Sequence, residues 1–212
     1  MSVRITIEHV KQALALRNFD AFQAQMGMSP SGRERMLPKA NNPPRQSAVL
    51  VLIYPKYDTG LNILLTKRTA HLRGHSGQVS FPGGSVDDTD TSHEHTALRE
   101  TCEEVGICEQ ERIQILGRLS KMWIPPSNFD VHPIVASMPS TPHMTLSTHE
   151  VANVHHMPLS ALVDDMTKKT TQMTFRNMQI DVPYYDVDAQ VVWGATAAML
   201  SELESRLKQV IA

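Results

Sequence analysis

Three glutamates, Glu100, Glu103 and Glu104, have the types and spacing to do chemistry together. On a helix, positions i, i+3 and i+4 share one face, so the three carboxylates project together. Like charges this close destabilise an isolated helix by about 0.2–0.5 kcal/mol per pair, so a neutralising partner is expected. Carboxylate oxygens suit Mg²⁺, Mn²⁺ or Ca²⁺ better than zinc. The spacing predicts a divalent-cation site, and it leaves open the alternative of a solvated charged helix face.

A basic arm and a tight turn, FPGG at residues 81–84, precede these glutamates. Arg68 and Arg73 are candidates for binding substrate phosphate, because a guanidinium pairs with two phosphate oxygens at once. Gly83 and Gly84 are candidate substrate-binding positions, since glycine lets the backbone approach a ligand or the glutamate helix closely. The alternatives are that Arg68 pairs with a structural carboxylate and that the glycines form an ordinary turn. The basic or titratable side chains of the arm are Lys67, Arg68, His71, Arg73 and His75.

Two stretches of the chain carry a resemblance to a known family. Gly84 followed by RETCEEVGI, residues 99–107, resembles the Nudix box of the Nudix hydrolases. The upstream run LLTKRTAHLRGHSGQVSFPGG, residues 64–84, is similar to the extra motif of the coenzyme A pyrophosphatase branch. The resemblance implies an enzyme that uses Mg²⁺ or Mn²⁺ to hydrolyse the diphosphate bond of coenzyme A or its derivatives. The products would be 3',5'-ADP and 4'-phosphopantetheine.

The site residues follow from the glutamate pattern and from the resemblance together. Glu100, Glu103 and Glu104 are the expected metal ligands and catalytic residues. Glu150 stands before a strand that ends in Pro-Leu, in THEVANVHHMPL at residues 148–159. In many Nudix hydrolases a glutamate in that place is an extra metal ligand or the general base, so Glu150 joins the catalytic set, with a surface glutamate as the alternative. Either Glu100 or Glu150 would accept the proton of the attacking water.

The sequence departs from the common Nudix box in the loop between Gly84 and Arg99. That segment is one residue longer than usual, and the register of the first acidic position lands on Asp90. No catalytic role is assigned to Asp90. Arg99 lies four residues before Glu103 and could orient it through an ion pair. Trp123 and Phe129 could stack on adenine, and core packing is the alternative for either.

The order of predicted elements favours an α/β protein. It combines strands with a helix over residues 96–105 that Gly106 ends, in agreement with the Nudix-like α/β/α sandwich and mixed sheet that the resemblance implies. An added helix over residues 6–26 and a linker, together residues 1–45, would pack on a Nudix domain of residues 46–212. The other predicted strands are 47–54, 61–68, 78–81, 112–119, 131–137, 150–157, 170–179 and 180–187, with a loop at 121–130 and helices at 158–164 and 191–210.

Composition sets limits on the class of protein. Apolar residues make up 41% of the 212 positions and the formal net charge is −2, which describes a globular protein without general nucleic-acid electrostatics. No secretory signal and no apolar run of membrane-spanning length is seen, so a cytoplasmic protein is expected, with no membrane or nucleic-acid partner. Cys102 and Cys108 are expected to be free thiols. Many relatives are homodimers, so the resemblance makes a homodimer a candidate assembly.

Two other functions compete with coenzyme A hydrolysis. One is a Nudix hydrolase of another nucleoside diphosphate derivative, such as ADP-ribose or a dinucleotide, against which the basic arm argues. The other is a nucleotide-sensing Nudix domain without turnover, against which the intact glutamates argue.

Overall fold

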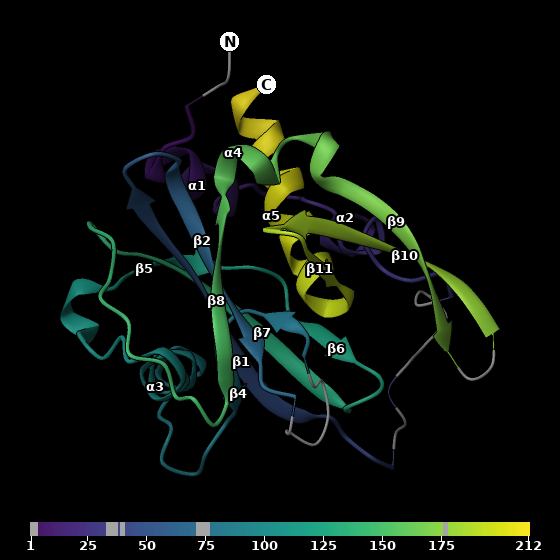
Figure 1. The fold of residues 1–212 in the computed structure, drawn as a ribbon, viewed down its shortest axis with the longest axis horizontal. Helices are drawn as coiled ribbons and strands as arrows, with labels where there is room; N and C mark the ends of the chain where they lie inside the picture. The colour runs from purple at the N-terminus through teal and green to yellow at the C-terminus, as the bar shows by residue number, and fades with distance from the viewer. Residues whose placement is uncertain (1–3, 33–37, 39–40, 71–76, 176–177) are drawn as a thin grey trace.

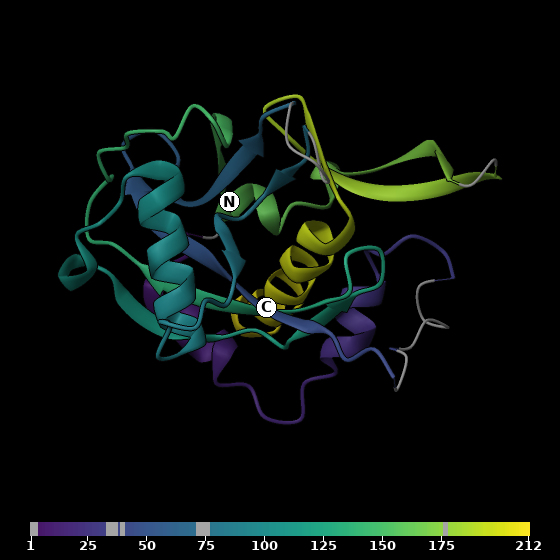
Figure 2. The same ribbon diagram turned by 90° about the horizontal axis from the view of Figure 1, so that it is seen from below.

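The computed structural model describes residues 4–32, 38, 41–70, 77–175 and 178–212. A mixed sheet lies between helices, which confirms the α/β fold class (Figure 1). Figure 2 shows the sheet with α3 on one side and α5 on the other. Within the part of the chain that is described, no helix is long and apolar enough to cross a membrane. The helices are α1 (Ile7–Leu14), α2 (Ala21–Met26), α3 (His93–Val105), α4 (Leu159–Leu162) and α5 (Gly194–Ile211).

The strands form one large sheet and one small one. In the large sheet β1 and β7 run parallel and the other pairs are antiparallel. The small sheet has the order β11-β10-β9, and its β9–β10 hairpin extends away from the rest of the molecule (Figures 1 and 2). The strands of the large sheet are β1 (Arg45–Lys56), β2 (Gly60–Arg68), β3 (Val79–Ser80), β4 (Gly83–Ser85), β5 (Gln114–Arg118), β6 (Met122–Ile124), β7 (Phe129–Ser137) and β8 (Val151–Pro158). Those of the small sheet are β9 (Lys168–Phe175), β10 (Met178–Val187) and β11 (Gln190–Trp193).

Strand β1 is buried on both faces and separates two apolar cores. Successive strand side chains point to opposite faces, so its alternate residues enter different cores. Leu50 and Leu52 pack in the core beneath α3, with Ala97 of that helix. Val51 and Ile53 pack in the core that α1 and α5 cover. A continuous apolar run in the sequence therefore becomes the central strand that holds α3 and α5 on opposite sides.

One edge of β1 is shared by two strands, and this division positions the loop before α3. Strand β2 pairs with the end of β1 at Ile53, whereas β4 pairs with the other end at Val49. The change of partner comes at Leu50, whose backbone N–H donates to the carbonyl of Pro82 at 2.9 Å. Strand β2 leaves β1 and continues along β3 and β8. The tight turn at residues 81–84 fills the space where β1 and β2 diverge.

Helix α3 begins and ends on local signals. The Ser92 side chain accepts a hydrogen bond from the backbone N–H of His95, so the helix starts at His93, three residues earlier than expected. Gly106 has φ 73°, and its N–H donates to the Cys102 carbonyl, as predicted for the residue that ends the helix. The helix therefore holds the carboxylates of its last two turns at a fixed end.

The cysteine prediction is wrong: Cys102 and Cys108 form a disulfide. The left-handed turn at Gly106 reverses the chain after α3 and brings the two Cα atoms within 4.6 Å. The absence of a disulfide framework and of a zinc spacing had favoured free thiols. The reversal that joins them needs the complete C-terminal cap.

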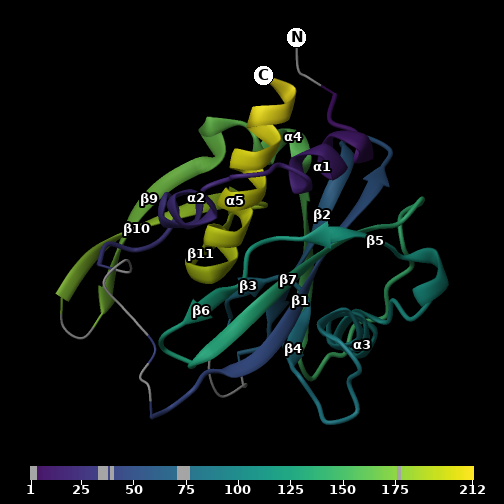
Figure 3. The same ribbon diagram turned by 180° about the vertical axis from the view of Figure 1, so that it is seen from behind.

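Three element boundaries also differ from expectation. The predicted N-terminal helix is two helices, α1 and α2, which both pack on α5 (Figure 3). Asp20 caps α2 through its side chain, and Asn18 has φ 58°, so the chain turns between the two helices. Strand β11 occupies residues expected to open the last helix, because Val192 pairs with Tyr185 of β10. Residues 121–130, expected as a loop, include β6, which pairs with the start of β7.

Candidate active site

Helix α3 places Glu104 and Glu100 against the glycine turn. Glu104 is buried, with 3% of its surface exposed, and one of its carboxylate oxygens accepts from the backbone N–H of Gly83 at 3.4 Å. A Cβ atom at Gly84 would overlap the carboxylate of Glu100. Gly84 therefore lets that carboxylate lie directly on the backbone of β4.

Gly83 serves the fold in a different way. It has φ 153°, a conformation that L side chains rarely adopt, and a Cβ there would overlap the backbone of Val49 and of Ala48. Its close approach is thus to β1, whereas that of Gly84 is to the glutamate helix. The expected close approach to the helix is made by Gly84. Substrate binding by the two glycines stays a prediction.

Arg99 holds two of the three glutamates in place. Its Nη1 donates to Glu100 Oε1 at 3.0 Å and to Glu103 Oε2 at 3.1 Å. Its Nε and Nη2 donate to the two oxygens of Asp90 at 3.0 and 2.9 Å, and Nη2 also donates to the Ser85 carbonyl at 3.1 Å. The predicted ion pair with Glu103 is confirmed, and it is one part of a larger hydrogen-bond network around the guanidinium.

Asp90 is the residue that the sequence left without a role. Its side chain is fully buried, and it accepts hydrogen bonds from Thr96 Oγ1 at 2.9 Å and from the backbone N–H of Asp87 at 2.9 Å. The Arg99 guanidinium holds the pKa of the Asp90 carboxyl well below its usual range. Asp90 is therefore a charged anchor for Arg99. The available signal was its register in the loop, six positions after Gly84.

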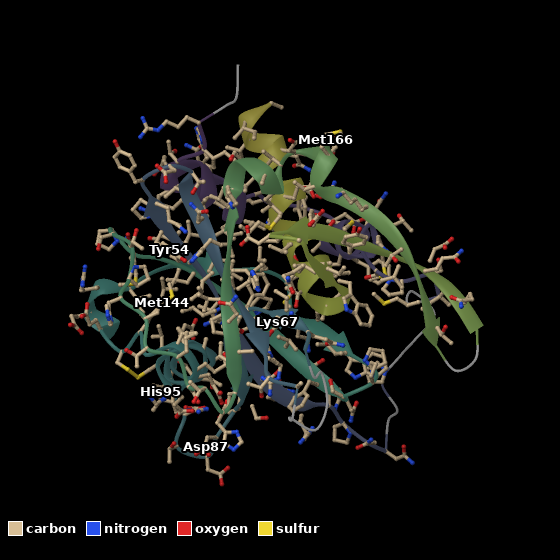
Figure 4. The ribbon with its side chains drawn as sticks, in the orientation of Figure 1. Tyr54, Lys67, Asp87, His95, Met144 and Met166 are labelled. Atoms are coloured by element: carbon tan, nitrogen blue, oxygen red, sulfur yellow. A yellow bond between two sulfur atoms is a disulfide. The ribbon has the colours of Figure 1, made fainter. Side chains whose placement is uncertain are left out.

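Arg68 faces the glutamates and Lys67 does not. Arg68 Nη1 lies 3.5 Å from Glu104 Oε1, so its partner is one of the candidate metal ligands. Lys67 Nζ donates to Gln190 Oε1 of β11 at 2.8 Å, on the opposite face of β2, where Figure 4 labels it. Neighbouring residues of a strand point to opposite sides, which explains the division. Arg68 and Lys67 thus place positive charge on opposite faces of β2.

Glu150 reaches the same site from the loop before β8. Its N–H donates to the Ser147 carbonyl at 2.9 Å, and the Ser147 N–H donates to the Glu104 carbonyl at 2.9 Å. Burial is the largest cause of the raised pKa of Glu100 and Glu104, and the negative charge of Glu150 raises both further. Burial and the surrounding charges raise the pKa of Glu104 to about 8. The negative charges of Glu103 and Glu150 therefore both act on Glu100, and those of Glu100 and Glu150 act on Glu104.

The donor atoms fit a hard divalent cation that is shared with a substrate. Buried Glu104, beside the charges of Glu100 and Glu150, is a carboxylate that a cation would stabilise. Glu103 is 55% exposed and turns toward Arg99. Among the described residues, no three acidic, histidine or cysteine side chains converge into a closed metal cage. Mg²⁺ needs no such cage, because it is commonly held by one or two carboxylates, substrate phosphates and water.

The remaining candidates are Arg73, Trp123 and Phe129. Arg73, like His71 and His75, falls outside the described residues, so its predicted substrate contact stays a prediction. Trp123 Nε1 donates to Asn128 Oδ1 at 3.0 Å within the β6–β7 turn. Phe129, also considered for adenine stacking, has its ring 4.1 Å from the Arg45 guanidinium carbon.

Comparison with known proteins assigns the chain to a family. The NUDIX domain model matches residues 44–176. The chain belongs to the Nudix family and is a Nudix hydrolase, and enzymes of this family generally use divalent cations.

Sequence relatives agree with this assignment, and a solved structure shares the fold. The "Uncharacterized Nudix hydrolase NudL" of Enterobacter sp. is 40% identical over 75% of this chain and 81% of its own. The protein of that name from Photorhabdus laumondii is 36% identical over 77% of this chain and 86% of its own. A Nudix hydrolase structure from M. smegmatis, RenU, has a TM-score of 0.53 at 17% identity, over 78% of this chain and 84% of that one, and shares the fold.

Proposed function

We propose that this Nudix hydrolase cleaves the diphosphate bond of coenzyme A or one of its derivatives, giving 3',5'-ADP and 4'-phosphopantetheine. The observation that carries the proposal is the position of Arg68. It ends β2 beside Glu104, and the basic arm that resembles the coenzyme A branch begins there. A substrate with a diphosphate and a further phosphate would place negative charge at both the glutamate site and the arm.

The chemistry assigns each described residue a task. When bound, Mg²⁺ or Mn²⁺ would neutralise diphosphate charge and lower the pKa of a coordinated water. Glu100, Glu103 and Glu104 would supply the ligand oxygens, and Arg99 would keep Glu100 and Glu103 oriented. Glu100 or Glu150 would accept the water proton. Arg68, which pairs with Glu104, would pair instead with a phosphate oxygen of the bound substrate.

The test is incubation of the protein with coenzyme A and Mg²⁺ or Mn²⁺, followed by chromatography of the products. Appearance of 3',5'-ADP and 4'-phosphopantetheine supports the proposal, with Glu104→Gln as an inactive control. Absence of both products while ADP-ribose or a dinucleotide is hydrolysed would transfer the proposal to another nucleoside diphosphate derivative. Calorimetric binding of nucleotide without any product would indicate a sensing domain.

The location, partners, domain boundary and assembly of the protein are also proposals. We expect it to act in the cytoplasm on a small-molecule substrate, without nucleic-acid or membrane partners. We also retain a domain boundary at residue 45 and a homodimer as proposals. Sedimentation of the purified protein checks the homodimer, and deletion of residues 1–45 checks whether 46–212 folds alone.

A further inference from the structure

The Cys102–Cys108 disulfide closes a short ring around part of the candidate metal site. Cys102 lies in α3 and Cys108 follows the Gly106 turn, so the residues between them include Glu103 and Glu104. Figure 4 shows the bond between the two sulfur atoms beside α3. Two candidate ligands therefore lie inside the segment that the disulfide constrains.

The end of α3 also anchors the loop that carries Glu150. The carbonyl of Glu104 accepts from Ser147 N–H at 2.9 Å, and the carbonyl of Val105 accepts from Thr145 N–H at 2.9 Å. The carbonyl of Ser147 in turn accepts from the N–H of Glu150 at 2.9 Å. Fraying of the last helical turn would release these bonds and shift carboxylates on both segments.

The chemical setting of the two sulfurs allows exchange. Cys108 is exposed, whereas Cys102 is half-buried in the helix. In the cytoplasm, the compartment proposed for this protein, disulfides are usually transient and catalytic or redox-sensing. An exposed cysteine next to a resolving cysteine is the arrangement that small disulfides can oxidise and small thiols can reduce.

We propose that reversible formation of the Cys102–Cys108 disulfide controls the metal site, with the oxidised form holding Glu103 and Glu104 in the binding geometry. The oxidant is a low-molecular-weight disulfide. The thiolate of Cys108 attacks one of its sulfurs and displaces one small thiol, and the thiolate of Cys102 then displaces the second. Two protein thiols lose two electrons and two protons, and the small disulfide becomes two thiols. The inference rests on the proposed metal-binding role of the glutamates and not on the identity of the substrate.

The experiment compares the full chain equilibrated with glutathione disulfide and with glutathione. Hydrogen exchange of the amides at residues 103–106 is measured without metal, and Mn²⁺ affinity is measured by calorimetry after the glutathione is removed. Because a cross-link over a short ring suppresses local opening, we expect the reduced form to exchange about tenfold faster and to bind Mn²⁺ several-fold more weakly. Equal exchange or equal affinity in the two forms would overturn the inference.

Cys108→Ser is the matched variant, because position 108 is exposed and serine leaves the Gly106 cap intact. It should behave like the reduced wild-type protein in both glutathione conditions. A redox response that persists in this variant would refute control by this disulfide. Failure of Mn²⁺ to bind either wild-type form would overturn the inference together with the metal site, an outcome distinct from equal binding by both forms.

Discussion

Asp90 and Arg99 form a bidentate ion pair in which the carboxylate is completely buried. The pair joins the acidic loop to α3, and the free arm of the guanidinium then reaches Glu100 and Glu103. Since Arg99 is fixed on one side by Asp90, its remaining N–H groups have defined directions. The orientation of two candidate metal ligands therefore depends on a residue that contacts neither of them.

Replacing Asp90 with asparagine should lower both stability and metal affinity. The change removes a charged partner from a guanidinium, and hydrogen bonds to charged groups contribute about 1.5–3 kcal/mol each. We expect a loss of about 1–3 kcal/mol in the free energy of unfolding, measured with urea, and about tenfold weaker Mn²⁺ binding. Asp88→Asn, two residues away on the exposed loop, is the control and should change neither. Wild-type Mn²⁺ affinity in Asp90→Asn would show that Arg99 needs no anchor.

Glu103→Gln and Glu104→Gln should each reduce turnover at least ~100-fold, because metal-assisted hydrolysis depends on the charged ligands. The loss of activity in Glu103→Gln should not come with a loss of stability. Glu103 is more than half exposed, and a substitution there should leave the unfolding free energy within about 0.5 kcal/mol of wild type. Near-normal rates at saturating Mg²⁺ in both variants would contradict the metal assignment.

The metal-free protein should lose stability as pH rises between about 4.5 and 8. Burial raises the pKa of Glu104 from its ordinary value of about 4.5 to about 8, so the folded state binds this proton more tightly than the unfolded state. The stabilisation is complete below the unfolded pKa and is lost as pH approaches the folded one. The slope from this single group is at most about 1.4 kcal/mol per pH unit. Urea unfolding in EDTA at several pH values measures it, and the slope difference between wild type and Glu104→Gln isolates it; identical slopes would refute the shift.

Gly84→Ala should affect mainly the metal site, whereas Gly83→Ala should affect mainly the stability of the fold. At Gly84 the new methyl group meets the end of the flexible Glu100 side chain, so the fold should persist while Glu100 moves and Mn²⁺ affinity falls about tenfold. At Gly83 the methyl group meets backbone of β1 at a left-handed φ, so the variant should be destabilised by several kcal/mol. Thermal melts and calorimetry on both variants check this. Gly84→Ala with unchanged affinity would show that Glu100 can leave the turn without cost.

Coenzyme A should be hydrolysed with a kcat/KM roughly tenfold or more above that of dephospho-coenzyme A, a difference of about 1.4 kcal/mol. The missing 3'-phosphate removes charge-assisted contacts with the basic arm. Replacing Arg68 and Arg73 with alanine should narrow the ratio. Lys67→Ala is the matched control, because Lys67 bonds Gln190 on the other face of β2 and should leave the ratio intact. Equal values for both substrates in the native protein would refute recognition of the 3'-phosphate and would point to the pantetheine arm as the specificity element or to nucleoside diphosphates in general as substrates.

Local signals in the sequence were enough for much of the framework. The helical spacing of Glu100, Glu103 and Glu104 fixes their common face, and Gly106 marks the end of that helix. The apolar run in residues 47–54 predicts the buried strand β1. Each of these features depends on neighbours within one or two turns of the chain, where backbone geometry converts spacing into direction.

Only the tertiary structure decided which of these groups meet. Glu150 approaches Glu104 through a loop bonded at Ser147, and Gly84 admits the Glu100 carboxylate because β4 pairs with β1 beneath α3. The Cys102–Cys108 bridge likewise needs the completed turn after the helix. Such contacts depend on where β2 leaves β1 and on how α3 packs over the sheet. Sequence periodicity specifies the direction of a side chain from its own element, whereas distances between elements are set by the packing of the whole core.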